Sequence, residues 1–157
     1  MDKQKIRKKL LDRLDELYSL TLKSFEELRK GSNEAPGAMQ SHSDTTKFQI
    51  GRLADEAADR MSKIKTAINT IQQFEEHKST IIQIDSIAEI NENGKLIIYY
   101  IVPEAAGGEK LDLGAIKINT ISISSPIGRA LINKKVGEIV ELLVPKGIRR
   151  LEILNIE

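Results

Sequence analysis

Two long apolar seams in the first half of the chain constrain its fold more than any other sequence feature. Residues 5–30 carry apolar side chains at alternating spacings of four and three residues, starting with Leu10, Leu14 and Leu17. A second seam of the same kind runs through residues 50–71. This spacing places apolar side chains along one stripe of a helix, as in a coiled coil. Two such helices of similar length, separated by a short polar segment, predict an antiparallel helical hairpin.

The residues that flank the seams predict where the two helices end. Gly31-Ser-Asn33 is a typical helix stop, and Pro36-Gly37 reinforces it. The second helix is predicted to begin at Ser43 or Asp44, because both residue types cap helices well, and to end near His77. The tip of the hairpin is therefore expected between these start and stop signals.

From Ser79 onward the pattern changes from helical seams to short apolar runs separated by turns. Asn93-Gly94 is a strong hairpin-turn signal, and residues 103–108 are predicted to form a loop. The predicted strands are residues 80–90, 95–102, 117–124, 138–144 and 148–156. We therefore expect an α+β chain, with an antiparallel coiled-coil hairpin at residues 1–77 and an antiparallel β-sheet domain with one short helix at residues 78–157.

The short helix of the second half is predicted from a capping pattern. Isoleucine and serine alternate over residues 121–124, which indicates the end of a half-buried strand. Ser125 then stands where an N-cap stands, and Pro126 at the first helical position, where the missing N–H costs nothing. The lysines of residues 133–135 suit a helix C-terminus, and Gly137 permits a turn. The predicted order is strand, capped helix, turn and strand.

This capped helix and its flanking strands resemble a known protein family. The segment SSPIGRALINKKVGEIVEL, residues 124–142, is similar to the C-terminal domain of the Gre family of bacterial transcript cleavage factors, GreA and GreB. The similarity extends from roughly Ile116 to the last residue. It implies that the sheet domain is FKBP-like and that the hairpin corresponds to the coiled coil of that family.

The resemblance also implies a partner and a mode of action. Members of the family insert the coiled coil into the secondary channel of RNA polymerase, where two acidic tip side chains help to hold Mg²⁺ and orient water. Carboxylates suit this task, because Mg²⁺ is a hard ion that prefers oxygen ligands. By resemblance, the partners are RNA polymerase and, indirectly, the 3′ end of the nascent RNA, and Mg²⁺ is needed only within the polymerase active site. The chain would have no cofactor, no small-molecule substrate and no enzyme activity of its own.

The tip departs from the family pattern at one acidic position. If Phe48 matches the aromatic residue of the family's tip, Asp44 falls on the second acid and Ser41 on the first. A serine cannot bind a metal as a carboxylate does, and Asp44 could equally serve as a helix N-cap. Lys47 and Arg52 follow the tip, where they could contact RNA phosphates or polymerase acids, or be ordinary solvated helix charges.

A second surface follows from the resemblance. In the family, the loop before the short helix docks on a coiled coil at the polymerase rim, and the matching residues here are Ser124, Ser125 and Pro126. GreB-like members carry an aspartate where Ser124 stands, so one charge-assisted contact would be missing. No base accompanies the two serines, which favours helix capping over a nucleophilic role.

Composition excludes several other classes of function. The chain has no Cys and only two His, so it offers no disulfide, no thiolate nucleophile and no convincing metal cluster. Its 24 Lys and Arg against 23 Asp and Glu lack the basic excess of a general duplex binder. There is no apolar run of about 18 residues and no apolar leader, so we expect a soluble, cytoplasmic protein without a membrane partner. Tyr99 and Tyr100 alone cannot line the aromatic pocket of a prolyl isomerase.

Three interpretations of the function stay open at this point. The favoured one is a Gre-like elongation factor that binds RNA polymerase through the secondary channel and modulates elongation, with or without stimulation of RNA cleavage. The second is a channel-binding regulator or inhibitor without cleavage activity, which Ser41 favours. The third is a helical-hairpin dimerisation protein unrelated to polymerase, for which the apolar seams would suffice.

Overall fold

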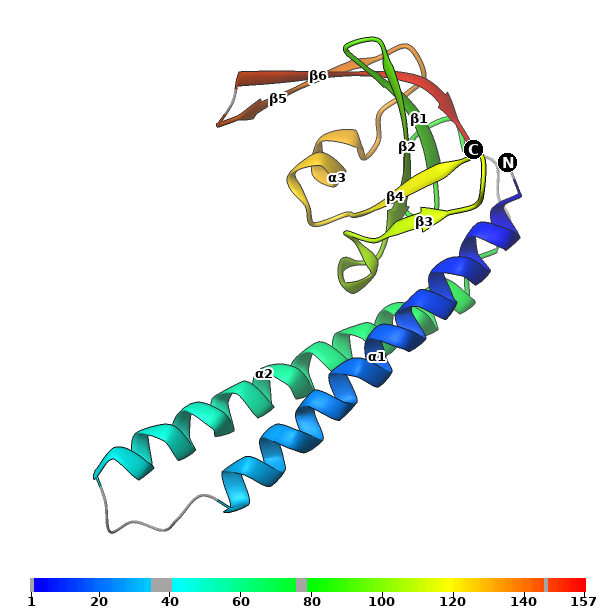
Figure 1. Cartoon of the computed structure of the whole chain (residues 1–157). Coiled ribbons are helices and arrows are strands. Elements are labelled where there is room, and N and C mark those ends of the chain that lie inside the picture. Colours follow the sequence, from blue (N-terminus) through cyan, green and yellow to red (C-terminus); the bar gives the residue numbers. More distant parts are fainter. Residues whose placement is uncertain (1, 35–40, 76–78, 146) are drawn as a thin grey trace. The chain divides into compact units, whose positions relative to one another are not determined.

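The computed structural model describes residues 2–34, 41–75, 79–145 and 147–157 of the chain (Figure 1). The chain divides into two compact units, one formed by residues 12–66 and the other by residues 1–11 together with 67–157. None of the helices in the described ranges combines the length and the apolar character that a membrane span requires.

Two long helices make up most of the first half of the chain. Helix α1 spans Lys3–Glu34 and helix α2 spans Ser41–Gln72. The helix stop predicted at Gly31 is wrong, because α1 continues through this residue; a glycine inside a helix costs only about 1 kcal/mol. The predicted start at Ser43 or Asp44 is also wrong, since α2 begins and ends a few residues earlier than expected. Asp44 therefore lies inside the helix and is not its N-cap.

Within residues 12–66 the two helices lie side by side and run antiparallel, as the apolar seams predict (Figure 1). Leu14, Ala54 and Ile64 are buried in this unit. Leu53, which the heptad spacing places in the seam, is instead half exposed, and its neighbour Ala54 takes the buried position. The difference arises because a straight helix has 3.6 residues per turn and drifts away from a strict heptad stripe.

A six-stranded, mostly antiparallel sheet forms the second half of the chain. Its strands follow the spatial order β3-β4-β2-β1-β6-β5. They are β1 (Ile87–Glu92), β2 (Lys95–Val102), β3 (Lys110–Asp112), β4 (Lys117–Ser122), β5 (Ile139–Val144) and β6 (Gly147–Ile156). The β2–β4 pair is parallel, and the other neighbouring pairs are antiparallel. The predicted α+β fold class is confirmed, with this parallel pair as an addition.

Two stretches of the sheet domain differ from the prediction. The strand expected at residues 80–90 forms only from Ile87 onward, because Asp85 adopts a left-handed conformation with φ of 69°, which interrupts an extended chain. The loop expected at residues 103–108 contains a 3₁₀ turn, Glu104–Ala106, and leads into β3. Strand β3 has only three residues, which is too short for an alternating pattern to reveal.

One face of the sheet packs against the short helix α3 (Pro126–Leu131) to form an aliphatic core. The core unites residues from the sheet, from α3 and from the segment before β1. Its buried members are Ile82, Ala88, Ile90, Tyr99, Ile101, Ile121, Leu131, Val140, Leu151 and Ile153. Because these residues come from five strands, the helix and the segment before β1, the core fixes α3 on the sheet.

The start of α3 passes very close to the end of β4. A Cβ atom added at Gly128 would lie only 2.0 Å from the carbonyl oxygen of Ser122, far inside the contact distance of real atoms. Glycine at this position therefore permits the approach of helix and strand.

We predict that Gly128→Ala destabilises the protein by about 1–3 kcal/mol or more, because the added methyl group must displace backbone. The matched control is Gly51→Ala in α2, where an added Cβ meets nothing within 4 Å. That control should raise stability by about 1 kcal/mol, the helix propensity of alanine over glycine. Urea denaturation of the three proteins measures both effects, and equal stabilities for the two variants would contradict the close approach.

Candidate functional site

The residues predicted at the hairpin tip lie on the first turns of α2. Ser41 and Asp44 belong to the helix, but their side chains fall outside the described part of the structure. Lys47 is exposed, and no ion pair or hydrogen bond joins it to another described residue. Arg52 donates to Glu56 at 3.3 Å in a pair whose side chains are 70% and 62% exposed. Such an exposed pair contributes little to stability, so it leaves Arg52 accessible to a partner.

Phe48 is the exposed aromatic residue beside this tip. Its side chain is 69% exposed, next to the exposed Lys47 on the same turn of α2. A large apolar side chain in this position contributes little to the stability of the hairpin itself. The first turns of α2 therefore offer a partner the positive charge of Lys47 and the aromatic ring of Phe48.

The acidic and histidine side chains of the described ranges show no cluster of the kind that binds a metal ion. Within the described ranges, no group of three or more His, Cys, Asp or Glu side chains could hold a metal. At the tip, position 44 carries one carboxylate and position 41 a serine. Mg²⁺ requires a near-octahedral set of oxygen ligands, so one carboxylate binds it only where other groups supply the remainder.

The second predicted site forms the turn between β4 and α3. The Ser125 hydroxyl accepts a hydrogen bond from the Gly128 amide at 3.0 Å and donates to the Ser122 carbonyl at 2.8 Å. The hydroxyl groups of Ser124 and Ser122 lie 3.0 Å apart, within hydrogen-bonding distance. Ser125 is thus the N-cap of α3, as predicted, and its hydroxyl proton is used within the turn. Pro126 is exposed and Ser124 and Ser125 are partly buried, so the proline is the most accessible residue of the three.

A shallow hollow beside this turn was not predicted from the sequence. It is lined by Gln83, Ile84, Ile123, Arg129 and Ile132. Arg129 is exposed, and its guanidinium forms no ion pair or hydrogen bond within the described ranges. The hollow therefore suits an apolar side chain accompanied by an acid. Sequence reasoning missed it because residues 83–84 meet α3 only through the tertiary fold.

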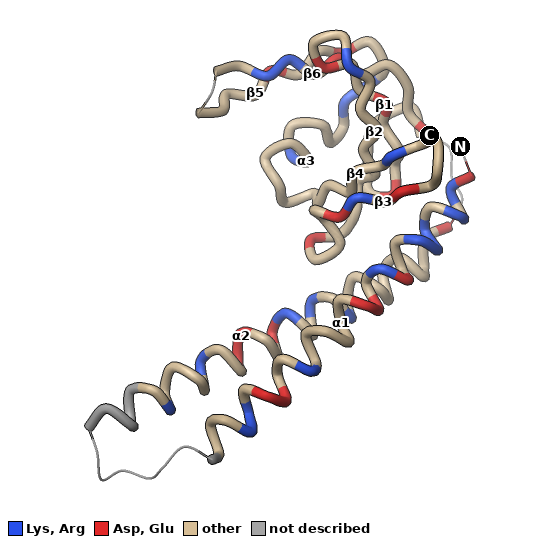
Figure 2. The backbone as a smooth tube through the Cα atoms, viewed as in Figure 1, with Lys and Arg blue, Asp and Glu red and all other residues tan. Residues whose placement is uncertain are grey.

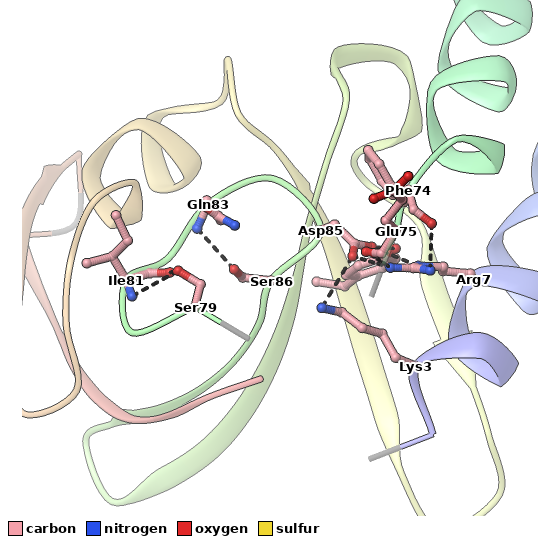
Figure 3. A network of polar contacts seen from close by, with 10 residues as sticks. Lys3, Arg7, Phe74, Glu75, Ser79, Ile81, Gln83, Asp85 and Ser86 are labelled. Carbon is pink, nitrogen blue, oxygen red and sulfur yellow. Dashed lines mark hydrogen bonds and ion pairs between the residues drawn. The ribbon is translucent and has the colours of Figure 1, made fainter. Parts of the chain in front are cut away.

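A buried carboxylate joins the start of α1 to the sheet domain. Asp85 is fully buried and accepts hydrogen bonds from Arg7 Nε at 3.0 Å and from the Tyr100 hydroxyl at 2.6 Å. Arg7 Nη2 also pairs with Asp85, and Lys3 Nζ lies 3.3 Å from it (Figure 3). The guanidinium of Arg7 donates further to the Phe74 carbonyl at 3.0 Å. These contacts tie the beginning of α1, the residues after α2 and the segment before β1 together.

The protonation of this network follows from its contacts. Burial by itself would raise the pKa of Asp85, but hydrogen bonds from Arg7 and Tyr100, with the charge of Lys3, hold that pKa below its ordinary value. Burial and the neighbouring carboxylate raise the pKa of Tyr100. At neutral pH Asp85 is therefore a charged carboxylate that accepts hydrogen bonds. Tyr100 keeps its hydroxyl proton and donates it to Asp85.

We predict that Asp85→Asn destabilises the protein by about 3–5 kcal/mol at pH 7, because Arg7 and Lys3 lose their buried counter-charge. Since the pKa of Asp85 is lower in the folded chain than in the unfolded chain, its stabilising effect is present above about pH 4. The effect is lost as the pH falls through the folded pKa. Urea denaturation at pH 7 and pH 3 measures the free energy of unfolding at each pH. This free energy should decrease less between pH 7 and pH 3 for Asp85→Asn than for the wild type.

The matched control for this experiment is Asp55→Asn, the same substitution at an exposed position of α2. It should leave nearly unchanged both the free energy of unfolding at pH 7 and the decrease of this free energy between pH 7 and pH 3. An Asp85→Asn variant with wild-type stability at pH 7 would show that the buried network does not stabilise the fold.

Comparisons with known proteins agree with one another. Residues 78–157 match the sequence model of a family described as "Transcription elongation factor, GreA/GreB, C-term". The transcription elongation factor GreA of Alkaliphilus oremlandii is 32% identical over 154 residues, which cover 95% of this chain and 90% of that protein. GreA of Flavobacterium psychrophilum is 28% identical over 151 residues, with the same coverage of the two chains.

Two solved structures are also similar over most of their length. GreA factor homolog 1 (Gfh1) of Thermus thermophilus is 20% identical, with 96% of this chain and 94% of that chain covered and a TM-score of 0.39. Gfh1 of Thermus aquaticus is 20% identical, with 96% and 95% covered and a TM-score of 0.40. Superpositions with these scores support no conclusion about this chain.

Proposed function

Because the chain belongs to the GreA/GreB family and is a Gre-like transcription elongation factor, we propose that it binds bacterial RNA polymerase through the secondary channel and modulates elongation. The observation that carries this proposal is the 32% identity to a GreA protein over 95% of the chain, which includes the hairpin as well as the sheet domain. Family membership argues against a dimerisation protein unrelated to polymerase.

The hairpin is the part that enters the channel. At about 1.5 Å per residue, each 32-residue helix is about 48 Å long, which gives a narrow element with a long reach. The exposed Lys47 and Phe48 lie near its tip, where a cation favours RNA phosphates and an aromatic ring favours bases. The reacting RNA and the catalytic metal ions belong to the polymerase, so the chain acts in the cytoplasm as an accessory factor and not as an enzyme.

The sheet domain holds the factor on the rim of the polymerase. The turn at residues 124–126 docks there through the exposed Pro126, with the neighbouring hollow and Arg129 beside it. Ser124 supplies no negative charge, and Ser125 is occupied as the cap of α3. Docking therefore depends on shape, apolar contact and the charge of Arg129 rather than on an acidic side chain in the turn.

A second candidate function is a regulator that occupies the channel without stimulating cleavage. Ser41 favours it, because the tip then carries Asp44 where the family carries two acids three residues apart. Both functions share the same polymerase interface and differ in whether one tip carboxylate is sufficient.

The test is a transcript cleavage assay on backtracked elongation complexes, combined with a direct measurement of polymerase binding. If cleavage is stimulated, Asp44→Ala should abolish it and leave binding nearly unchanged, because the variant removes the one carboxylate at the two positions where the family carries acids. The matched control is Asp55→Ala, an exposed acid further along the same helix, which should retain both properties. Binding without cleavage by the wild type would support the second candidate function, and an absence of binding would overturn both.

Restoring the missing acid gives a complementary prediction. Ser41→Asp should raise the cleavage rate by about tenfold or more, since one additional charge-assisted interaction contributes about 1.5 kcal/mol. The same assay measures the change, with Ser62→Asp on the exposed surface of α2 as the control. A Ser41→Asp variant that binds but cleaves no faster would show that the serine is not what limits cleavage.

A further inference from the structure

The two edges of the sheet are protected to very different degrees. Strand β3 at one edge has three residues and carries Lys110 and Asp112, which discourage pairing with another strand. Strand β5, at the other edge, lies beside β6 in Figure 2. It has six residues, Ile139–Val144, of which all but Glu141 are aliphatic. An edge strand of this length and composition is a template for pairing with a further strand.

The backbone groups of β5 that face outward can be assigned from its pairing with β6. Ile153 donates its amide to the Glu138 carbonyl at 3.0 Å. Because hydrogen-bonded and non-bonded pairs alternate along an antiparallel ladder, the N–H and C=O groups of Ile139, Glu141 and Leu143 point to the free edge. No backbone partner for these groups exists within the described ranges.

The side chains of β5 are apolar on both faces of the sheet. Val140 belongs to the core beneath α3, so alternation places Ile139, Glu141 and Leu143 on the opposite face. There Leu143 is 87% exposed and stands opposite Ile148, which is 63% exposed, while Ile139 is 51% exposed. This exposed cluster, Ile139, Leu143 and Ile148, adjoins the unpaired backbone edge.

We propose that β5 pairs antiparallel with β5 of a second copy of the chain, which extends the sheet across a two-fold axis. With the axis at Glu141, Ile139 of each copy stands opposite Leu143 of the other, so all three outward residues find a backbone partner. In each half of the interface, Ile139 of one copy therefore packs beside the Leu143–Ile148 pair of the other copy. The strand is self-complementary in this register, which is the argument for a second copy rather than an unrelated strand.

The charges at the centre of this interface balance. Glu141 is paired with Arg150 of its own chain, with Arg150 Nε 3.2 Å from Glu141 Oε1. The two-fold axis therefore sets a row of arginine, glutamate, glutamate and arginine, which is neutral as a whole. The two adjacent glutamates still repel each other, because like charges directly opposite weaken strand pairing.

The interface is small, so the dimer is expected to be weak. Six residues of edge strand from each copy cover less than the area of a standard stable interface, and we expect a dissociation constant on the order of 100 μM. This self-association goes beyond the proposed function and does not depend on it.

The test is analytical ultracentrifugation of the full chain over a concentration series that spans this value, combined with amide hydrogen exchange. We expect a monomer–dimer equilibrium in which the amides of Ile139, Glu141 and Leu143 gain protection as the concentration rises. The amides of Val140 and Leu142, which face β6, should be protected at all concentrations. Dimerisation without this alternating pattern, or a monomer throughout the series, would overturn the proposal.

Two variants of β5 and one control sharpen the test. Leu143→Lys should abolish the dimer and leave the fold intact, since this side chain is 87% exposed; thermal unfolding at low concentration checks the fold. Leu20→Lys on α1, where the leucine is 59% exposed, should leave the dimer unchanged. Glu141→Gln should lower the dissociation constant of the dimer about threefold, because it removes the two negative charges that face each other at the axis. Loss of the dimer in Leu20→Lys but not in Leu143→Lys would assign it to the hairpin and overturn the pairing through β5.

Discussion

The buried carboxylate of Asp85 is the constraint on which the base of the hairpin and the sheet domain both depend. An unpaired charge at a fully buried position would be very unfavourable, so the fold must bring cations and donors to it. Arg7 and Lys3 come from the first turns of α1, and Tyr100 comes from β2. Because Arg7 also binds the Phe74 carbonyl, the same guanidinium holds the residues that follow α2. One interaction therefore orders three separate segments of the chain.

A second local constraint shapes the surface that we propose docks on the polymerase. The Ser125 cap and the close approach at Gly128 fix the start of α3 against the end of β4. These contacts hold the turn between them in one conformation, and a preorganised loop loses little conformational entropy when it binds a partner. This explains why hydroxyl groups in the turn are used internally, while the exposed proline and the neighbouring arginine face outward.

Sequence patterns predicted the elements whose signals are local. The seams predicted the hairpin, and the Ser125-Pro126 pair predicted the capped helix, because capping and periodicity depend on residues a few positions apart. The same reasoning placed helix ends too early or too late and missed β3, whose three residues are too few to show a period. It also treated Asp85 as part of a strand, since a left-handed residue held by distant donors leaves no local signal.

By itself the sequence determined the two long helices, the short capped helix, most of the strands and the membership of the GreA/GreB family. The expectation that Ser41 stands at the position of a tip acid also rests on the sequence alone. Only the tertiary structure decided that Arg7 neutralises Asp85, 78 positions away, and that the hollow beside α3 brings residues 83–84 next to Arg129. It also decided that β5 lies at a free edge of the sheet. The physical reason is the same in each case, because burial, pairing and exposure depend on which distant residues the packed chain brings together.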